Sequence, residues 1–156
     1  MKIAPLVAQH IGEVVHDNWT DIYLDDVISD ITYEEAIALP AGATNSIAML
    51  VNHLGFYNNI VMERLLGTDP VIDDTNGFNI SVNSNEDWQR LKASVINSFK
   101  ALADYVKALP DEKIFSLTPN GHSTFYKTLH GISEHAHYHL GQIVLLKKMV
   151  RHNYTK

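Results

Sequence analysis

The sequence predicts an all-α fold, an up-down-type four-helix bundle with long connecting loops. Four segments carry apolar residues at helical spacing, and no segment shows the period-two alternation with turn dipeptides that marks a hairpin. The chain has 156 residues, of which 46% are apolar and 19% are charged. This is the composition of a globular protein and the length of one domain, so residues 1–156 are expected to form a single domain.

The first helix is expected from about Pro5 to Asp17, because proline suits the first helical position. Its apolar stripe contains Val7, Ile11, Val14 and Val15. The second helix is expected from about Thr44 to Leu66, where Gly67 is a favourable stop. Its stripe contains Ile47, Leu50, Leu54, Ile60, Val61 and Leu65.

The third helix is expected to open at Ser84, with Asp87 in a capping position, and to stop at Pro110. The fourth covers about Thr124 to Val150. The connections, residues 18–43, 68–83 and 111–123, are longer than those of simple bundles. Within the first, short helical turns are expected at Leu24–Ser29 and Tyr33–Ala38. Such loops either build a pocket at the end of a bundle or merely cap its core.

Charge and composition exclude several classes of function. The net charge of −6 and the lack of a basic stripe argue against a nucleic-acid partner. No apolar run approaches the roughly 20 residues of a membrane span, and no signal-peptide core is present, so a cytoplasmic protein with no membrane partner is expected. The chain has no cysteine, which excludes disulfides, thiolate metal sites and a cysteine nucleophile.

The stretch "SEHAHYHLGQI", residues 133–143, concentrates three of the nine histidines. On a helix, His135 and His139 lie one turn apart on the same face and can reach one cation, whereas His137 points to the far side. Their face is otherwise largely apolar. Burying two histidines there is costly unless a metal or an internal hydrogen bond satisfies them, and both readings stay open.

His53 is the best third ligand, because it lies among apolar and aromatic residues in the middle of the second helix. Three neutral imidazoles would leave a coordination position open, as in catalytic sites. Gln142 shares the face of His135 and His139 and could hydrogen-bond a ligand or a metal-bound water. His10 falls on the stripe of the first helix, where it either lines a pocket or is a hydrogen-bonded core histidine. Tyr57 could wall a pocket or simply belong to the core.

The segments "NSIAMLVNHLGFYNNIVMERLLG" and "TLHGISEHAHYHLGQIVLLKK" closely resemble the DinB/YfiT-like family of four-helix bundles. The family pattern is one histidine on the second helix and His-x3-His-x-Gly-Gln-Ile on a later one. The resemblance covers nearly the whole chain. It implies that His53, His135 and His139 bind a divalent metal ion, commonly zinc or nickel, and that the protein is a homodimer.

One branch of that family comprises metal-dependent transferases that use a low-molecular-weight thiol and an electrophilic substrate. Such a reaction suits a chain without cysteine, since the sulfur must come from outside. One alternative is metal-dependent hydrolysis, which requires a general base; a loop carboxylate such as Asp73 or Asp74 could serve. Another is a non-catalytic, stress-related bundle that binds a metal or a small ligand.

Overall fold

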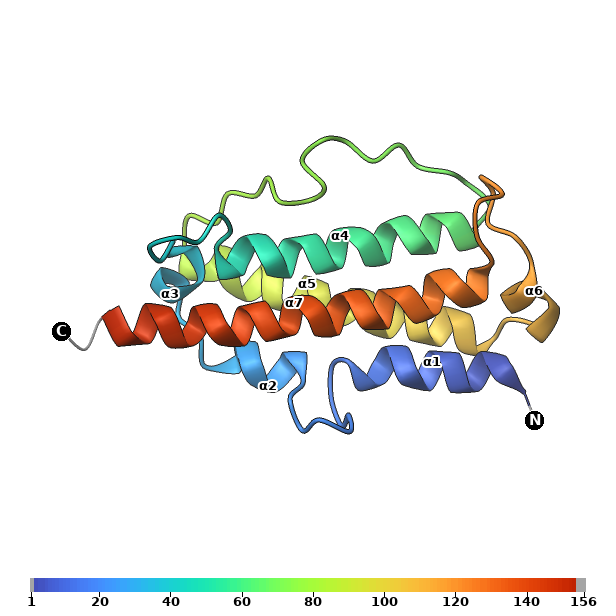
Figure 1. Ribbon diagram of the computed structural model, residues 1–156, viewed down its shortest axis with the longest axis horizontal. Coiled ribbons are helices and arrows are strands. Elements are labelled where there is room, and N and C mark those ends of the chain that lie inside the picture. Colours follow the sequence, from blue (N-terminus) through green and yellow to red (C-terminus); the bar gives the residue numbers. More distant parts are fainter. Residues whose placement is uncertain (1, 154–156) are drawn as a thin grey trace.

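The computed structural model describes residues 2–153, and seven helices lie within that range (Figure 1). They are α1 (Ile3–Glu13), α2 (Leu24–Ser29), α3 (Tyr33–Ile37), α4 (Ile47–Leu65), α5 (Asn85–Lys107), α6 (Asp111–Phe115) and α7 (Phe125–Asn153). Among the described residues, extended pairing is limited to an isolated bridge between Leu117 and Thr124. The all-α class predicted from the sequence is therefore confirmed.

Four helices, α1, α4, α5 and α7, form the bundle. Both α1 and α4 pack against α5 and against α7, so α1 and α4 lie diagonally opposite each other. Figure 1 shows that α1 and α7 run in one direction along the bundle, whereas α4 and α5 run together in the other. The helix order therefore does not alternate strictly, and the chain between α4 and α5 must return along the length of the bundle.

Residues 66–84, here called the crossover segment, make that return over the outer side of α4 (Figure 1). A long crossover is what two consecutive parallel helices require, because a short turn can join only antiparallel neighbours. The segment contains no helix or strand, and it places residues from its middle beside the middle of α4. This position matters for the candidate site.

The core is continuous from Ala4 in α1 to Leu146 in α7. Its largest fully buried aromatic side chains are Trp88, Phe99 and Phe125. The indole N–H of Trp88 donates a hydrogen bond to the carbonyl of Ile31 over 2.8 Å, which joins α5 to the segment before α3. A buried aromatic side chain whose polar atom is hydrogen-bonded contributes strongly to the stability of the core.

The ends of the helices differ from the expected bounds for identifiable reasons. α4 begins after Ser46, whose hydroxyl accepts a hydrogen bond from the N–H of Met49, rather than at Thr44. The first helix ends at Glu13 and not near Asp17, because the carbonyls of Val14 and Val15 accept hydrogen bonds from the N–H groups at the start of α2 instead of continuing the helix. Asp17, with a φ of 62°, then turns the chain away. The expected cap at Ser84 is confirmed, since its hydroxyl accepts from the N–H of Asp87.

The short helix α6 is absent from the sequence-based prediction, and it has a structural role. The carboxylate of Asp111 accepts hydrogen bonds of 3.0 Å from the backbone N–H groups of Ile3 and Ala4. These groups are unpaired donors of the first turn of α1, where a negative charge is also favourable. Asp111 therefore caps α1 from a position more than a hundred residues away in the chain.

An ionic cluster fixes the last turns of α7 to α2 and α3. The Arg151 guanidinium contacts the carboxylates of Asp30 and Glu35, and the Lys147 ammonium contacts Asp30. The hydrogen bond from Lys147 lowers the pKa of Asp30, and that from Arg151 lowers the pKa of Glu35. Among the described residues, none of the helices is both long and apolar enough to cross a membrane.

Candidate metal centre

Three histidines meet between α4 and α7. His53 lies on α4, and His135 and His139 lie on adjacent turns of α7, which runs antiparallel to α4 (Figure 1). Each offers a ring nitrogen, and these three nitrogens all lie within 4.8 Å of one another. His53 and His139 are buried, with exposed fractions of 5% and 7%, and His135 is half-buried. The structure thus brings together the three residues that the sequence singled out.

Two hydrogen bonds fix which nitrogen of the ring carries the proton. His53 Nδ1 lies 2.5 Å from the backbone carbonyl oxygen of Asn76, and His139 Nδ1 lies 2.7 Å from Oε1 of Gln142. A carbonyl oxygen can only accept, so both Nδ1 atoms must donate a proton. In the neutral rings, Nε2 of His53 and of His139 therefore carries a free lone pair. Histidines that bind a metal ion through one ring nitrogen typically donate a hydrogen bond from the other nitrogen to an oxygen in this way.

The crossover segment covers one side of this cluster. The ring of Phe78 stacks on that of His53, with centroids 4.0 Å apart and planes 13° from parallel. The Tyr57 hydroxyl donates to the side-chain oxygen of Asn76 over 2.9 Å, and the amide of Asn52 donates to the carbonyl of Gly77 over 2.7 Å. These contacts hold the segment against α4 and exclude water from the face of His53.

Backbone geometry makes glycine necessary at position 77. Gly77 has a φ of 73°, and a Cβ atom added there would lie 2.5 Å from Cβ of Phe56. Asn76, before it, has a φ of 50°, in the left-handed region that asparagine tolerates. This Asn-Gly turn aims the Asn76 carbonyl at His53. The Asn-Gly dipeptide is a visible turn signal, but it does not reveal what the turn contacts.

Burial keeps all three histidines neutral over a wide pH range. It lowers the pKa of His53 and of His139 below the ordinary histidine value, and the hydrogen bonds to Asn76 and Gln142 offset part of this effect. Burial, with the neighbouring His139 and His53, lowers the pKa of His135 to about 4. Neutral imidazoles are the form that binds metal ions.

The sequence also predicted residues that surround the ligands, and the structure places two of them, Gln142 and Tyr57, at the cluster. Gln142 lies at the cluster and contacts His139, and its amide also donates to the hydroxyl of Tyr138 over 3.1 Å. The ring of Tyr57 lies 4.9 Å from that of His53 and 5.1 Å from that of His135. Tyr57 therefore walls the cluster.

His10 lies away from the three-histidine cluster and outside the core, at a separate pocket between α1 and α7. Its side chain is 48% exposed and lies near Glu13, and its ring stacks against His130 and His137 on the opposite side of α7. The buried residues of α1 are Ala4, Ala8 and Ile11, a face that leaves His10 outside the core. His137 lies on this same side, as its position in the helix predicted, and its Nδ1 contacts the carbonyl of Ser133.

Carboxylates are distant from the cluster or already engaged. The carboxylate of Asp73 accepts hydrogen bonds from the backbone and hydroxyl of Thr75, and both Asp73 and Asp74 are exposed. Glu134 pairs with His130 at the surface. Among the described residues, no aspartate or glutamate joins the three histidines as a further candidate ligand.

The donor set fits a divalent metal ion. His53 Nε2 and His135 Nε2 face each other at 2.9 Å, a contact that requires a proton or a cation between them because two lone pairs repel. Imidazole nitrogens bound to one zinc ion at about 2.0–2.1 Å stand roughly 3.3 Å apart in tetrahedral geometry. The observed separations, 2.9 Å for this pair and at most 4.8 Å within the group, bracket that value.

The lowered pKa of His135 predicts how stability depends on pH. Unfolded histidine titrates near about 6.5, whereas folded His135 titrates at about 4. Between these values the unfolded chain binds a proton that the folded protein does not, so the free energy of unfolding of metal-free protein should fall as the pH decreases from about 6.5 to about 5. Urea titrations across this range should show the fall.

The variant His135→Gln should reduce the slope of this dependence, because glutamine does not titrate, whereas His53 and His139, whose pKa values are also lowered, keep the remainder. His137→Gln is the matched control, since His137 lies on the same helix but outside the cluster, and it should keep the slope of the parent. Equal slopes for His135→Gln and the parent would contradict the buried, neutral state of His135.

Comparison with known proteins places the chain in a family. No curated protein matches the sequence. The model of the DinB superfamily matches residues 19–143, a range that contains all three clustered histidines and Gln142. The match covers most of the chain and agrees with the all-α bundle described above. The protein therefore belongs to the DinB superfamily.

Proposed function

We propose that the protein binds a divalent metal ion, zinc or nickel, through Nε2 of His53, His135 and His139. The observation that carries this proposal is the convergence of three ring nitrogens, two of which are left unprotonated by fixed hydrogen bonds at Nδ1. With three protein ligands, a coordination position remains for a substrate atom, as in catalytic zinc sites.

The reaction that this site supports best is transfer of a low-molecular-weight thiol to an electrophile. A bound divalent cation lowers the pKa of a coordinating thiol and so supplies a thiolate at neutral pH. In the transfer, the sulfur bonds to the electrophilic carbon as the bond to the leaving group breaks with its electron pair, and the thiol proton passes to solvent. The chain has no cysteine, so no thiol of its own competes for the cation.

The residues around the cluster contribute to this reaction by holding the imidazoles in place and by excluding water. The Asn76 carbonyl and the Gln142 amide hold His53 and His139 in the required tautomer. Phe78 and Tyr57 shield the cluster from water, which strengthens electrostatic interactions inside it. Within the described part of the chain no aspartate or glutamate joins the cluster as a general base, which favours thiol transfer over hydrolysis.

The family relation also supports a homodimer as the assembly of this protein in solution. Light scattering should then give twice the 17.5 kDa mass of the chain at micromolar concentration. A scattering mass equal to that of one chain would contradict this part of the proposal.

The ligand assignment predicts the effect of four substitutions on zinc or nickel affinity, measured by calorimetry on protein without a histidine tag. His53→Ala, His135→Ala and His139→Ala each remove one of three ligands and should weaken binding by more than the roughly 10 to 100-fold typical of losing an outer partner. Gln142→Ala removes such a partner and should fall within that range. Each protein is first checked for folding by circular dichroism.

His137→Ala is the matched control for this series, because its ring lies on the α1 side of α7 and should leave the affinity unchanged. The ligand assignment fails if His137→Ala weakens binding as much as His135→Ala does. It also fails if His53→Ala binds the metal as tightly as the parent.

Thiol transfer is tested by incubating the zinc- or nickel-loaded protein with monochlorobimane and, in turn, glutathione, bacillithiol and mycothiol. We expect a rate above that of the metal-free protein with one of these thiols, and loss of that rate in His135→Ala but not in His137→Ala. Metal binding without turnover for every thiol would instead indicate a non-catalytic metal-binding bundle.

A further inference from the structure

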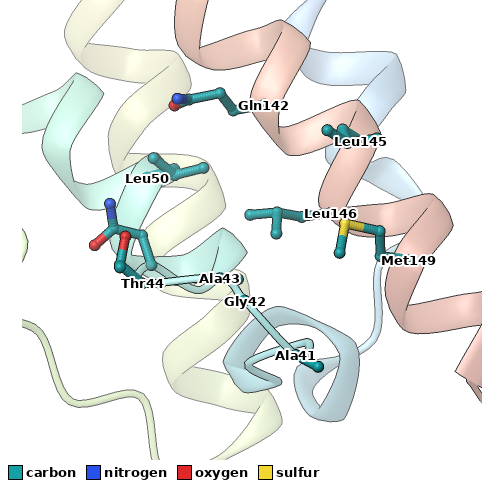
Figure 2. A pocket seen from close by; sticks show the side chains of 10 residues that line it. Ala41, Gly42, Ala43, Thr44, Leu50, Gln142, Leu145, Leu146 and Met149 are labelled. Atoms are coloured by element: carbon teal, nitrogen blue, oxygen red, sulfur yellow. The ribbon is translucent and has the colours of Figure 1, made fainter.

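A pocket of about 390 Å³ lies between α4 and α7 next to the histidine cluster, and the segment before α4 closes it from below (Figure 2). It is lined by Ala41, Gly42, Ala43, Thr44, Asn45, Leu50, Gln142, Leu145, Leu146 and Met149. Its volume is within the range of small-molecule sites in proteins. We call it the α4/α7 pocket.

None of the described residues that line the α4/α7 pocket has a charged side chain. Leu50, Leu146 and Met149 project into it in Figure 2, and its polar groups are those of Thr44, Asn45 and Gln142. A second pocket, between α2 and α7, differs sharply, because its lining includes Asp26, Lys147 and Arg151. An ion placed in the α4/α7 pocket would lose hydration without gaining a partner charge, whereas an uncharged apolar group would be stabilised there.

Gln142 connects the pocket to the candidate metal centre. Its side chain forms the end of the pocket in Figure 2, and its Oε1 accepts the hydrogen bond from His139 Nδ1 over 2.7 Å. Leu50, on the opposite wall, lies one helical turn before His53 on α4. A molecule that fills the pocket therefore contacts the residue that orients one of the three imidazoles.

We infer that the α4/α7 pocket binds the uncharged, apolar body of the electrophilic substrate, an assignment that rests on the proposed thiol transfer. The polar end of that substrate faces Gln142 and the histidine cluster. Thiol co-substrates such as glutathione carry carboxylates and an ammonium group, for which this pocket offers no opposite charge. They bind outside it, so the pocket sets specificity for the electrophile and not for the thiol.

The inference is tested with two fluorescent probes of nearly the same shape. N-phenylnaphthylamine is uncharged and apolar, and anilinonaphthalene sulfonate carries an additional anionic group. We expect the parent protein to bind the uncharged probe at least about tenfold more tightly than the sulfonate, because the pocket offers the anion no cationic partner.

Two matched variants place the binding site. Leu145→Glu adds a charge to the lining of the pocket, and Leu117→Glu adds one outside it; the parent side chains are 59% and 61% exposed, so neither change disturbs the core. Leu145→Glu should weaken binding of N-phenylnaphthylamine by about tenfold or more, and Leu117→Glu should not change it.

Equal affinity of Leu145→Glu and the parent for N-phenylnaphthylamine would overturn the inference, as would sulfonate binding as tight as that of the uncharged probe. Zinc titration of the same three proteins separates this result from a failure of the proposed function. Leu145→Glu should bind zinc like the parent, because Leu145 is not a member of the cluster and lies more than one helical turn beyond His139 on α7. A parent that binds the probe but not zinc would refute the metal site and leave the pocket in place.

Discussion

The hydrogen bond from His53 Nδ1 to the backbone carbonyl of Asn76 is the interaction on which the candidate metal centre depends. It buries a proton donor against an acceptor that cannot titrate, and it leaves Nε2 unprotonated toward His135 and His139. Without it, a buried imidazole on α4 would be an unsatisfied polar group in an apolar helix interface. The same contact therefore pairs a buried N–H group and leaves the Nε2 lone pair of His53 free to bind a cation.

This contact follows from the order of the helices. α4 and α5 run in the same direction, so the chain between them has to travel back along α4 (Figure 1). The return path brings the Asn76-Gly77 turn over His53, where Phe78 covers the ring and Tyr57 holds Asn76. The crossover segment thus supplies both the connection that the topology requires and the outer shell of the site. On the other side, α7 supplies its own outer partner through Gln142.

The sequence predicted the features of the site that follow from helical periodicity. It missed those that depend on the route of a loop in the tertiary structure. The spacing of His135 and His139 placed them on one face of α7, and the apolar context of His53 marked it as buried. The Asn76 carbonyl has no side-chain signal, because every residue has one, and its role depends on where the crossover segment runs. His10 falls on the predicted apolar stripe of α1 and yet lies outside the core, because a stripe read in steps of three and four also passes through a neighbouring, exposed position.

The tautomers of the clustered histidines in metal-free protein test the account most directly, because they are set by the crossover segment and by Gln142. Nitrogen-15 chemical shifts from long-range proton–nitrogen NMR spectra distinguish a protonated Nδ1 from a protonated Nε2 in each ring. We predict that His53 and His139 carry the proton on Nδ1 near pH 7, and that Asn76 and Gln142 accept it. Spectra in which His53 carries its proton on Nε2 would contradict the claim that the crossover segment prepares this site for a metal ion.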